Sequence, residues 1–414
     1  MTRLKPAAGR SGGQQVSATA DHTFASRAAG SPIRLQNGGH RLALPHYPFQ
    51  PLPQPRGQAP YRFDLGQLLH EDALASITRA GKLVLHVVGD TGDERGKQMD
   101  FVADMMTADY HASADDAIPA CLYHLGDVVY FAGDVDKYGE CFYETYADYP
   151  PQIVSIPGNH DCQPDDPQDG AVDPNKQPLD GWVQNFMSDD PTRLGSLKTT
   201  SSRTQMDLPN VYWTFTTPLA TIIGLFSNVS ETEAEIHADQ IAWFQSELKA
   251  AAAADPAKAL IVAIHHPPFS GDAVHSGSTE AERILFESFQ ATGVWPHLIL
   301  SGHVHNYQRF SVKEPVGNTT LALTSVVIGN CGYSRLGKLH KIGNDYPAAP
   351  LQLSDALVLE SYDQDNFGYL RLEIDKDKIT GIYSSAPYAE ELKPNVSVLD
   401  QWDIPLRPVI LPGA

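Results

Sequence analysis

Six side chains of types that bind metal ions follow five short apolar runs of this chain. In chain order they are Asp90, Asp127, Asn159, His265, His303 and His305. Carboxylate and amide oxygens combined with imidazole nitrogens suit transition-metal ions such as iron, manganese or zinc. A carboxylate that bridges two ions lets them lie ~3.5–4 Å apart, where both can engage one phosphate group. Asp127, in the central loop of the set, is the candidate bridge, and we predict a pair of metal ions around it.

Buried strands that alternate with helices are needed to bring these residues together. Residues 82–88 form an apolar strand before Asp90, and residues 97–111 have helical spacing. Further strands are expected before the other site residues, at 121–125, 152–156, 260–264 and 298–300. Open α/β sheets place their ligands at the carboxyl ends of strands. The predicted fold class is therefore α/β, with the site at these ends.

Composition shifts along the chain indicate the domain boundaries. The expected parts are a Pro/Gly-rich arm at 1–60, a catalytic domain at 61–390 with an insertion at 162–210, and a C-terminal tail at 391–414. Arms of this composition bury little surface. Trp182 and Phe186 are the expected anchors of the insertion, which would lie near the site.

The second half of the chain changes from alternating to β-rich segments. A helix is expected over 234–254, where an apolar stripe indicates core packing. The late β-rich runs are expected to form a second sheet without helical crossovers, and they lie at 321–328, 356–359, 369–374 and 379–383.

Charge and composition argue against several classes of partner. A net charge of −20 repels polyanions, so neither nucleic acid nor an anionic membrane surface is an expected partner. No run approaches the ~20 apolar residues of a membrane helix, and residues 1–30 lack the apolar core of a secretory signal. The four cysteines form no CxxC pair and are expected to be free thiols in a reducing cytoplasm. A leader already removed would instead indicate a periplasmic or secreted protein.

Five short blocks, each at a predicted strand end, resemble those of a known enzyme family. The blocks are Gly89-Asp90-Thr91-Gly92, Gly126-Asp127-Val128-Val129-Tyr130, Gly158-Asn159-His160-Asp161, Val262-Ala263-Ile264-His265 and Gly302-His303-Val304-His305. In this order they resemble calcineurin-like metallophosphoesterases, specifically the purple acid phosphatase branch. The resemblance covers roughly residues 80–310. It implies a four-layer α/β/β/α sandwich with two mixed β-sheets.

The resemblance also implies how two metal ions would share the ligands. One ion would take Asp90, Tyr130 and His305, the other would take Asn159, His265 and His303, and both would share Asp127. Gly92 stands where many metallophosphoesterases have a histidine ligand. In the purple acid phosphatase pattern a tyrosine compensates for that glycine, so Gly92 and Tyr130 support each other.

Tyr130 has two interpretations. A phenol with a pKa of ~10 binds a metal only when a strongly acidic ion such as ferric iron removes its proton. The metal pair would then be iron with iron, manganese or zinc. If Tyr130 packs in the core instead, the pair would be more labile, with manganese alone or iron with manganese.

Two histidines are expected to act on the substrate. His160 follows Asn159 directly and would stabilise phosphoryl oxygens or protonate the leaving group. His275 resembles a second family histidine that assists the leaving group, and a solvent-exposed loop histidine is the alternative. Arg309, after the last block, is either structural or phosphate-binding.

Hydrolysis of phosphate esters by attack of metal-bound hydroxide is the function that the resemblance implies. A phosphomonoesterase is favoured, and its substrate would be a small phosphorylated molecule. A phosphodiesterase, for example of cyclic nucleotides, is the alternative, because both activities use the same metal core. A non-catalytic binding protein on the same fold would lack ligands, whereas every family position here carries a competent residue.

Overall fold

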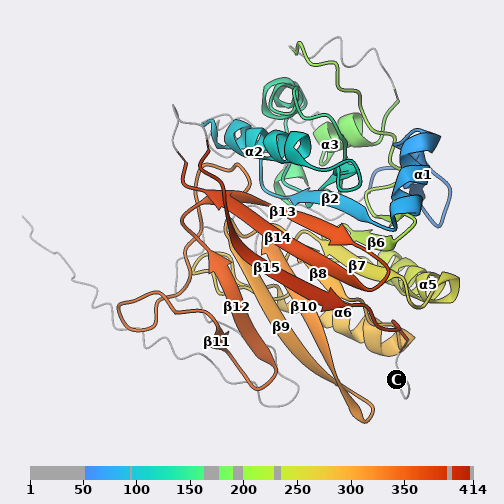
Figure 1. Cartoon of the computed structure of the whole chain (residues 1–414), viewed down its shortest axis with the longest axis vertical. Coiled ribbons are helices and arrows are strands. Elements are labelled where there is room, and N and C mark those ends of the chain that lie inside the picture. The colour runs from blue at the N-terminus through green and yellow to red at the C-terminus, as the bar shows by residue number, and fades with distance from the viewer. Residues whose placement is uncertain are drawn as a thin grey trace, which may run out of the picture.

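Two mixed β-sheets form the centre of the molecule, and helices lie outside them (Figure 1). The structure is a computed structural model that describes residues 52–93, 96–162, 177–189, 199–227, 235–388 and 394–410. The predicted α/β class with two mixed sheets is confirmed.

The larger sheet has nine strands in the order β1-β5-β6-β7-β8-β10-β9-β12-β11. Their bounds are β1 Arg62–Asp64, β5 Trp213–Thr216, β6 Ala220–Leu225, β7 Ala259–Ile264, β8 Leu298–Ser301, β9 Tyr307–Val316, β10 Thr319–Ile328, β11 Leu351–Gln352 and β12 Leu357–Asp363. Strands β6, β7, β8 and β10 are parallel neighbours. Their carboxyl ends therefore lie at one edge of the sheet.

The smaller sheet has six strands in the order β15-β14-β13-β2-β3-β4. Their bounds are β2 Leu83–Val88, β3 Cys121–His124, β4 Gln152–Ser155, β13 Phe367–Ile374, β14 Lys378–Ala386 and β15 Ser397–Pro405. Strands β2, β3 and β4 are parallel, and β13 pairs with β2 in the antiparallel direction.

Helices on both sides of the sheets complete the expected α/β/β/α layers. Their bounds are α1 Glu71–Ala80, α2 Gln98–Ala112, α3 Asp180–Phe186, α5 Ala238–Ala254 and α6 Thr279–Thr292. Helices α2 and α3 lie beside the smaller sheet, and α5 and α6 lie beside the larger one (Figure 1). No helix within the described ranges is long and apolar enough to cross a membrane.

Strand β7 illustrates why these segments form buried strands. Its residues Leu260, Val262 and Ile264 belong to the apolar cluster that includes α5 and α6. The alternate residues Ile261 and Ala263 belong to the cluster that includes the smaller sheet. All five are at most 2% exposed. Because a strand buried on both faces reads as a continuous apolar run, the sequence alone predicts it.

The strands and helix predicted before the site are confirmed to within about two residues. The helix expected at 97–111 is α2, and the strand expected at 82–88 is β2. The helix expected at 234–254 is α5, which begins at Ala238, and residue 234 lies outside the described residues.

The prediction that the late β-rich runs form one second sheet is wrong. Strands β10 and β12 join the larger sheet, whereas β13 and β14 join the smaller one. Alternation of side chains specifies which face of a strand is buried, and the choice of partner strand depends on contacts far away in the sequence.

The C-terminal tail expected from residue 391 contains a strand, so that boundary is corrected. Strand β15 pairs with β14 along its length, and the indole of Trp402 lies where a Cβ at Gly381 would be, 2.0 Å from its nearest carbon. Only Asp400 and Trp402 of this edge strand are buried, which explains its weak apolar signal. The domain continues to Pro405, and residues 389–393 and 411–414 lie outside the described ranges.

The predicted arm and insertion are described only in part. Residues 1–51, 163–176 and 190–198 lie outside the described ranges. Arg56, at the end of the arm, forms ion pairs with Asp189 and Asp207 of the insertion. Trp182 and Phe186 on α3 are fully buried, which confirms them as anchors.

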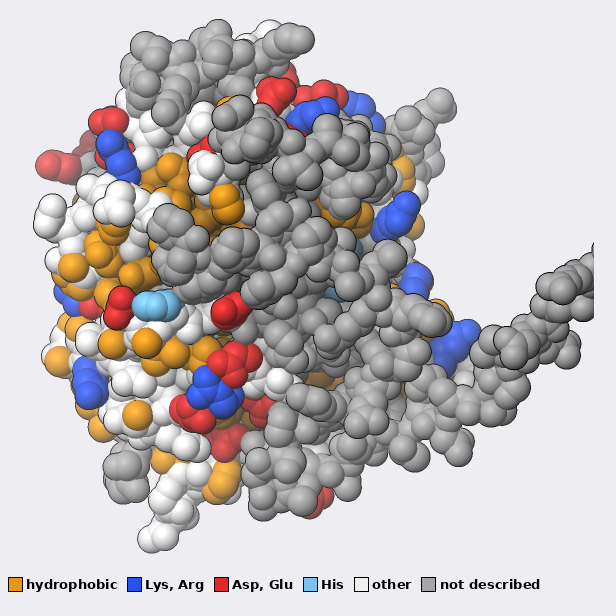
Figure 2. Space-filling view, turned by 180° about the vertical axis from the view of Figure 1, so that it is seen from behind, with side chains coloured by type: hydrophobic (Ala, Val, Ile, Leu, Met, Phe, Trp, Pro, Cys, Tyr) orange, Lys and Arg blue, Asp and Glu red, His pale blue; other side chains and the backbone are white. Residues whose placement is uncertain are grey.

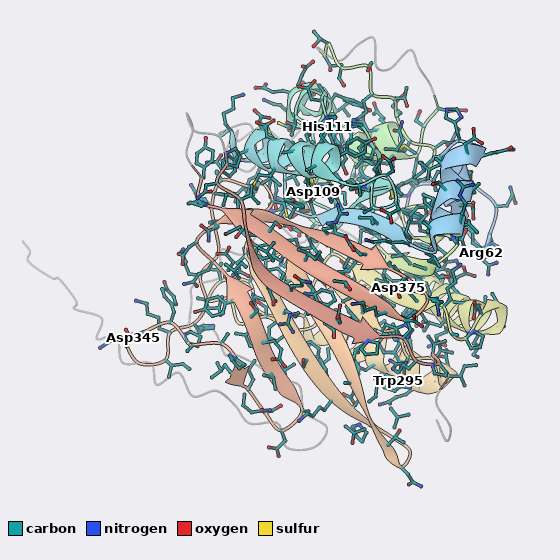
Figure 3. All side chains as sticks on the ribbon, in the orientation of Figure 1. Arg62, Asp109, His111, Trp295, Asp345 and Asp375 are labelled. Carbon is teal, nitrogen blue, oxygen red and sulfur yellow. The ribbon has the colours of Figure 1, made fainter. Side chains whose placement is uncertain are left out.

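Asp109 on α2 fastens this helix to the smaller sheet (Figure 3). Its Oδ2 lies 2.9 Å from His86 Nε2 on β2 and 2.6 Å from Arg371 Nη1 on β13. Burial lowers the pKa of His86. The helix that precedes the second site loop is thereby held in a fixed position on the sheet.

Several basic side chains on the surface lie next to acidic ones (Figure 2). Arg283 on α6 is 2.5 Å from both Glu280 and Glu287, and Lys378 is 2.9 Å from Asp403. Such exposed pairs contribute little to stability, because water screens both charges. Acidic neighbours thus neutralise these basic side chains, and the net charge of the protein stays strongly negative.

Candidate metal centre

The five predicted site loops meet at the carboxyl ends of β2, β3, β4, β7 and β8. The structure brings together all seven residues predicted as ligands, each at most 8% exposed, namely Asp90, Asp127, Tyr130, Asn159, His265, His303 and His305. Within each sheet the loops lie at one edge because the strands are parallel, and the packing of the two sheets on each other brings both sets of loops together. Segments far apart in the sequence thus supply one buried polar cluster.

Three of these residues have a left-handed backbone conformation. The φ angle is +58° at Asp90, +53° at Asp127 and +68° at His303. Such conformations cost about 1–3 kcal/mol each and cluster at functional sites. The Asp90 N–H donates to Gly126 O at 3.0 Å, and the His303 N–H donates to Asp90 Oδ2 at 2.8 Å. These bonds hold the loops in turns that depart from strand alternation.

The Tyr130 hydroxyl lies at the centre of a first group of candidate ligands. It is 3.0 Å from Asp90 Oδ1, 3.0 Å from Asp127 Oδ2 and 3.1 Å from His305 Nε2. Burial and the negative charges of Asp127 and Asp90 raise the pKa of Tyr130. The phenol has one proton for three acceptors, so this arrangement would favour an ion that takes the place of that proton.

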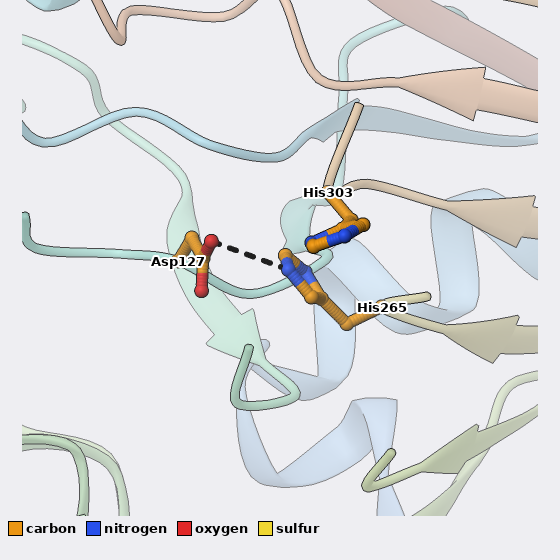
Figure 4. Close-up of side chains that lie close together, drawn as sticks. All are labelled: Asp127, His265 and His303. Atoms are coloured by element: carbon orange, nitrogen blue, oxygen red, sulfur yellow. Dashed lines mark ion pairs between the residues drawn. The ribbon is translucent and has the colours of Figure 1, made fainter. Parts of the chain in front are cut away.

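Asn159 lies at the centre of a second group. Its Oδ1 is 3.1 Å from His265 Nε2 and 2.9 Å from His303 Nδ1. His265 Nε2 is also 3.2 Å from Asp127 Oδ2, an ion pair that Figure 4 shows beside the ring of His303. Ligand atoms of Asp127, His265 and His303 all lie within 4.8 Å of one another. Asp127 therefore belongs to both groups.

The donor set of the second group fits a metal ion. His265 Nδ1 lies 2.8 Å from Leu125 O and donates its proton there, which leaves Nε2 for the cluster. Burial lowers the pKa of His265, but Asp127 more than offsets this and raises it to about 9. A cation bound at Nε2 would replace that proton. Asn159 Nδ2 is buried and has no hydrogen-bond partner within the described residues.

The contacts of Gly92 leave no room for a histidine side chain at this position. A Cβ at residue 92 would lie 2.2 Å from Val128 O. The Gly92 N–H donates to Val128 O at 3.0 Å, and the Tyr130 N–H donates to Gly92 O at 2.6 Å. The same pairing that excludes a side chain at residue 92 brings Tyr130 next to Asp90.

Asp161 holds the loop of Asp127 in place through hydrogen bonds to its backbone. Its carboxylate accepts the backbone N–H groups of Asp127 at 2.8 Å, Val128 at 3.0 Å and Gly158 at 2.8 Å. Burial and the charge of Asp127 raise the pKa of Asp161 to about 7, and the donated N–H groups oppose this rise. Asp161 thus joins the second and third site loops.

An Asp161→Ala variant is expected to lower the free energy of unfolding by about 3 kcal/mol or more. It leaves three buried N–H groups without an acceptor, and each costs about 1–3 kcal/mol. Urea denaturation of the metal-free protein measures the change. The control is Asp116→Ala, at an exposed position, and equal stability of the two variants would contradict the supporting role.

His160 and His275, predicted to act on substrate, both lie at the cluster. The His160 N–H donates to Asp127 Oδ1 at 2.8 Å, and its Nδ1 donates to Phe131 O at 2.8 Å. The His275 ring centroid is 5.0 Å from that of His303 and 5.3 Å from that of His305. Burial lowers the pKa of His275 to about 4. The side chain of His275 is half-buried beside these rings, so a role on the substrate stays the favoured prediction.

Tyr333 was not expected at the site. Its ring centroid lies 4.2 Å from that of Tyr130 and 4.5 Å from that of His305, and its N–H donates to Asp90 O at 2.9 Å. It follows β10, whose position beside β8 no local pattern predicts. In the sequence, Tyr333 is marked only by the glycines that precede it after this strand, Gly329 and Gly332.

Arg309 has a structural role, which is one of the two predicted for it, and not a phosphate-binding one. Its Nε lies 2.7 Å from Asp400 Oδ2 on β15. Tyr307, two residues earlier, donates its hydroxyl proton to the same carboxylate at 2.9 Å. This end of β9 in the larger sheet is thereby fastened to β15 of the smaller one.

Residues 83–307 match the family model of calcineurin-like phosphoesterases, which is more than half of the chain. This chain belongs to the calcineurin-like phosphoesterase family. The matched region of this phosphoesterase begins at β2 and includes all five site loops. No curated protein matches its sequence.

Two solved structures have a fold similar to that of this calcineurin-like phosphoesterase. GAP50, the anchor in the inner membrane complex of Plasmodium, has a TM-score of 0.51 and 13% identity over 79% of this chain and 89% of its own. Purple acid phosphatase PPD1 from yellow lupin (Lupinus luteus) seeds has a TM-score of 0.51 and 15% identity over 78% of this chain and 54% of its own. At these identities the similarity shows the fold alone.

Proposed function

We propose that this protein is a purple acid phosphatase-like phosphomonoesterase with two metal ions. The observation that carries the proposal is the pair of adjoining ligand groups that share Asp127, one centred on the Tyr130 hydroxyl and one on Asn159 Oδ1. Bound ions would polarise the phosphoryl group and activate water. The substrate would be a small phosphorylated molecule.

The protein's own groups then have definable roles. His160 donates from Nδ1 to Phe131 O, which fixes its tautomer and leaves Nε2 for the substrate. The half-buried ring of His275 lies beside those of His303 and His305, so it suits a bond to substrate or leaving group. Both side chains would bind phosphoryl oxygens or transfer a proton to the leaving oxygen.

The metal pair we propose is iron with iron, manganese or zinc. The reason is Tyr130, since its buried phenol surrounded by Asp90, Asp127 and His305 loses its proton only to a strongly acidic ion. We also propose a cytoplasmic location, because none of the four cysteines, all buried and within the described residues, forms a disulfide.

Metal removal tests the proposal directly. The purified protein is expected to contain two metal ions per chain and to hydrolyse p-nitrophenyl phosphate. A chelator should abolish turnover, and iron with manganese or zinc should restore it. Faster turnover of bis-p-nitrophenyl phosphate would favour the phosphodiesterase alternative.

The decisive control is whether the metal-free protein stays folded, which circular dichroism measures. Loss of activity with a retained spectrum assigns the effect to the metal site. A folded, fully metal-loaded protein that hydrolyses neither ester would reject the esterase and favour a binding protein on the same fold.

A further inference from the structure

We infer that Asp272 is a positioning residue that holds His275 at the candidate metal centre. The inference deepens the proposed function and rests on it. Asp272 lies in the loop between β7 and α6, and it is 0% exposed. None of the five family blocks contains it, so its role has to follow from its contacts.

The carboxylate of Asp272 makes three hydrogen bonds, all with neutral donors. Oδ1 accepts the N–H groups of Val274 and His275, both at 2.8 Å. Oδ2 accepts from Asn306 Nδ2 at 3.0 Å. Burial raises the pKa of Asp272 to about 6, and these donors oppose the rise. A carboxylate in this environment is costly to bury, which indicates that its bonds have a specific purpose.

The partner Asn306 follows His305 and belongs to a second set of bonds to the same loop. Asn306 Oδ1 accepts from Gln308 Nε2 at 2.8 Å. Gln308 Oε1 in turn accepts the N–H of Gly271 at 2.7 Å. The polar motif after the last site block therefore attaches the loop that carries His275 to the segment that carries His305.

His275 itself is held at both backbone groups. Its N–H donates to Asp272 Oδ1, and its carbonyl oxygen accepts from Ser270 Oγ at 2.8 Å. Only the side-chain torsions are left to adjust, so the position of this backbone decides where the imidazole lies. Because the ring contacts the rings of both His303 and His305, a shift of the loop displaces it from the cluster.

The Asp272→Asn variant breaks one bond of this network. Asparagine still offers an oxygen to Val274 and His275, but its Nδ2 faces Asn306 Nδ2, and two donors cannot pair. We expect kcat to fall by about 10- to 100-fold with little change in KM, as misplacement by about 1 Å does. The matched control is Asp355→Asn, at an exposed position.

Two further variants separate positioning from general stability. The exchange Asp272→Asn with Asn306→Asp restores a donor opposite an acceptor and should recover most of kcat. In a His275→Ala background, Asp272→Asn should lower kcat no further, because its effect passes through His275. An equal loss of kcat in that background, or no loss in the single variant, overturns the inference.

The wild-type protein separates this inference from the proposed function. A metal-loaded wild type without turnover rejects the proposed function. The positioning role is then decided by NMR of the His275 imidazole, assigned with His275→Ala. An unchanged His275 resonance in Asp272→Asn overturns the inference, and a shifted resonance that the exchange variant restores supports it.

Discussion

An Asp127→Asn variant is expected to lose at least about 1,000-fold in kcat/KM and to bind fewer than two metal ions per chain. Asp127 Oδ1 accepts the His160 N–H, while Oδ2 faces the Tyr130 hydroxyl and His265 Nε2. An amide has one oxygen for these two positions. Whichever way it turns, the substituted amide presents its N–H₂ group to another donor or to the bound ion.

Charge strengthens this expectation. Burial raises the pKa of Asp127, but His265 and His160 more than offset this and hold it below its usual range. Asp127 is thus an anion that both ligand groups share, and asparagine removes that charge from each of them. Metal analysis of the purified variant and kinetics with p-nitrophenyl phosphate measure the two losses.

Asp116→Asn is the matched control for this variant, because it makes the same change at an exposed position. Thermal unfolding of both proteins shows whether the fold is retained. Two bound metal ions together with wild-type kinetics in folded Asp127→Asn would reject Asp127 as the shared ligand.

A Tyr130→Phe variant is expected to lose the visible absorption of the iron-loaded protein and about 10- to 100-fold in metal affinity at the first group. The hydroxyl is the atom that lies about 3 Å from Asp90, Asp127 and His305. Phenylalanine keeps the ring contacts with Tyr333 at 4.2 Å and His160 at 4.5 Å. The change therefore removes a ligand atom and preserves the packing.

Tyr333→Phe provides the comparison for Tyr130→Phe. It removes a neighbouring phenol, so the iron-loaded variant should keep its visible band. A band of equal intensity in Tyr130→Phe and wild type, with iron bound to both, would show that Tyr130 packs without binding the metal.

The local sequence was sufficient to predict a candidate site residue where that residue closely follows its strand. Asp90, Asn159 and His265 each come within four residues of a buried apolar run, and within each sheet parallel strands bring their carboxyl ends to one edge. The division of the ligands between two groups came from the family resemblance. In the structure the Tyr130 hydroxyl lies among one set of these side chains and Asn159 Oδ1 among the other.

Partner choice between distant segments was decided by the tertiary structure alone. Strand β15 was missed because only Asp400 and Trp402 of it are buried, and the late strands are divided between two sheets by pairings with β2 and β8. Tyr333 reaches the site because β10 pairs with β8, and Asp272 is joined to Asn306 by a hydrogen bond between two loops.

The sequence by itself determined which side chains could bind metal and at which strand ends they lie, because both depend on residues a few positions apart. Only the tertiary structure decided what surrounds them, namely the ring of Tyr333 and the network from Asp272 to Gln308. Those contacts join segments whose closeness depends on the packing of the whole chain, and no local pattern encodes it.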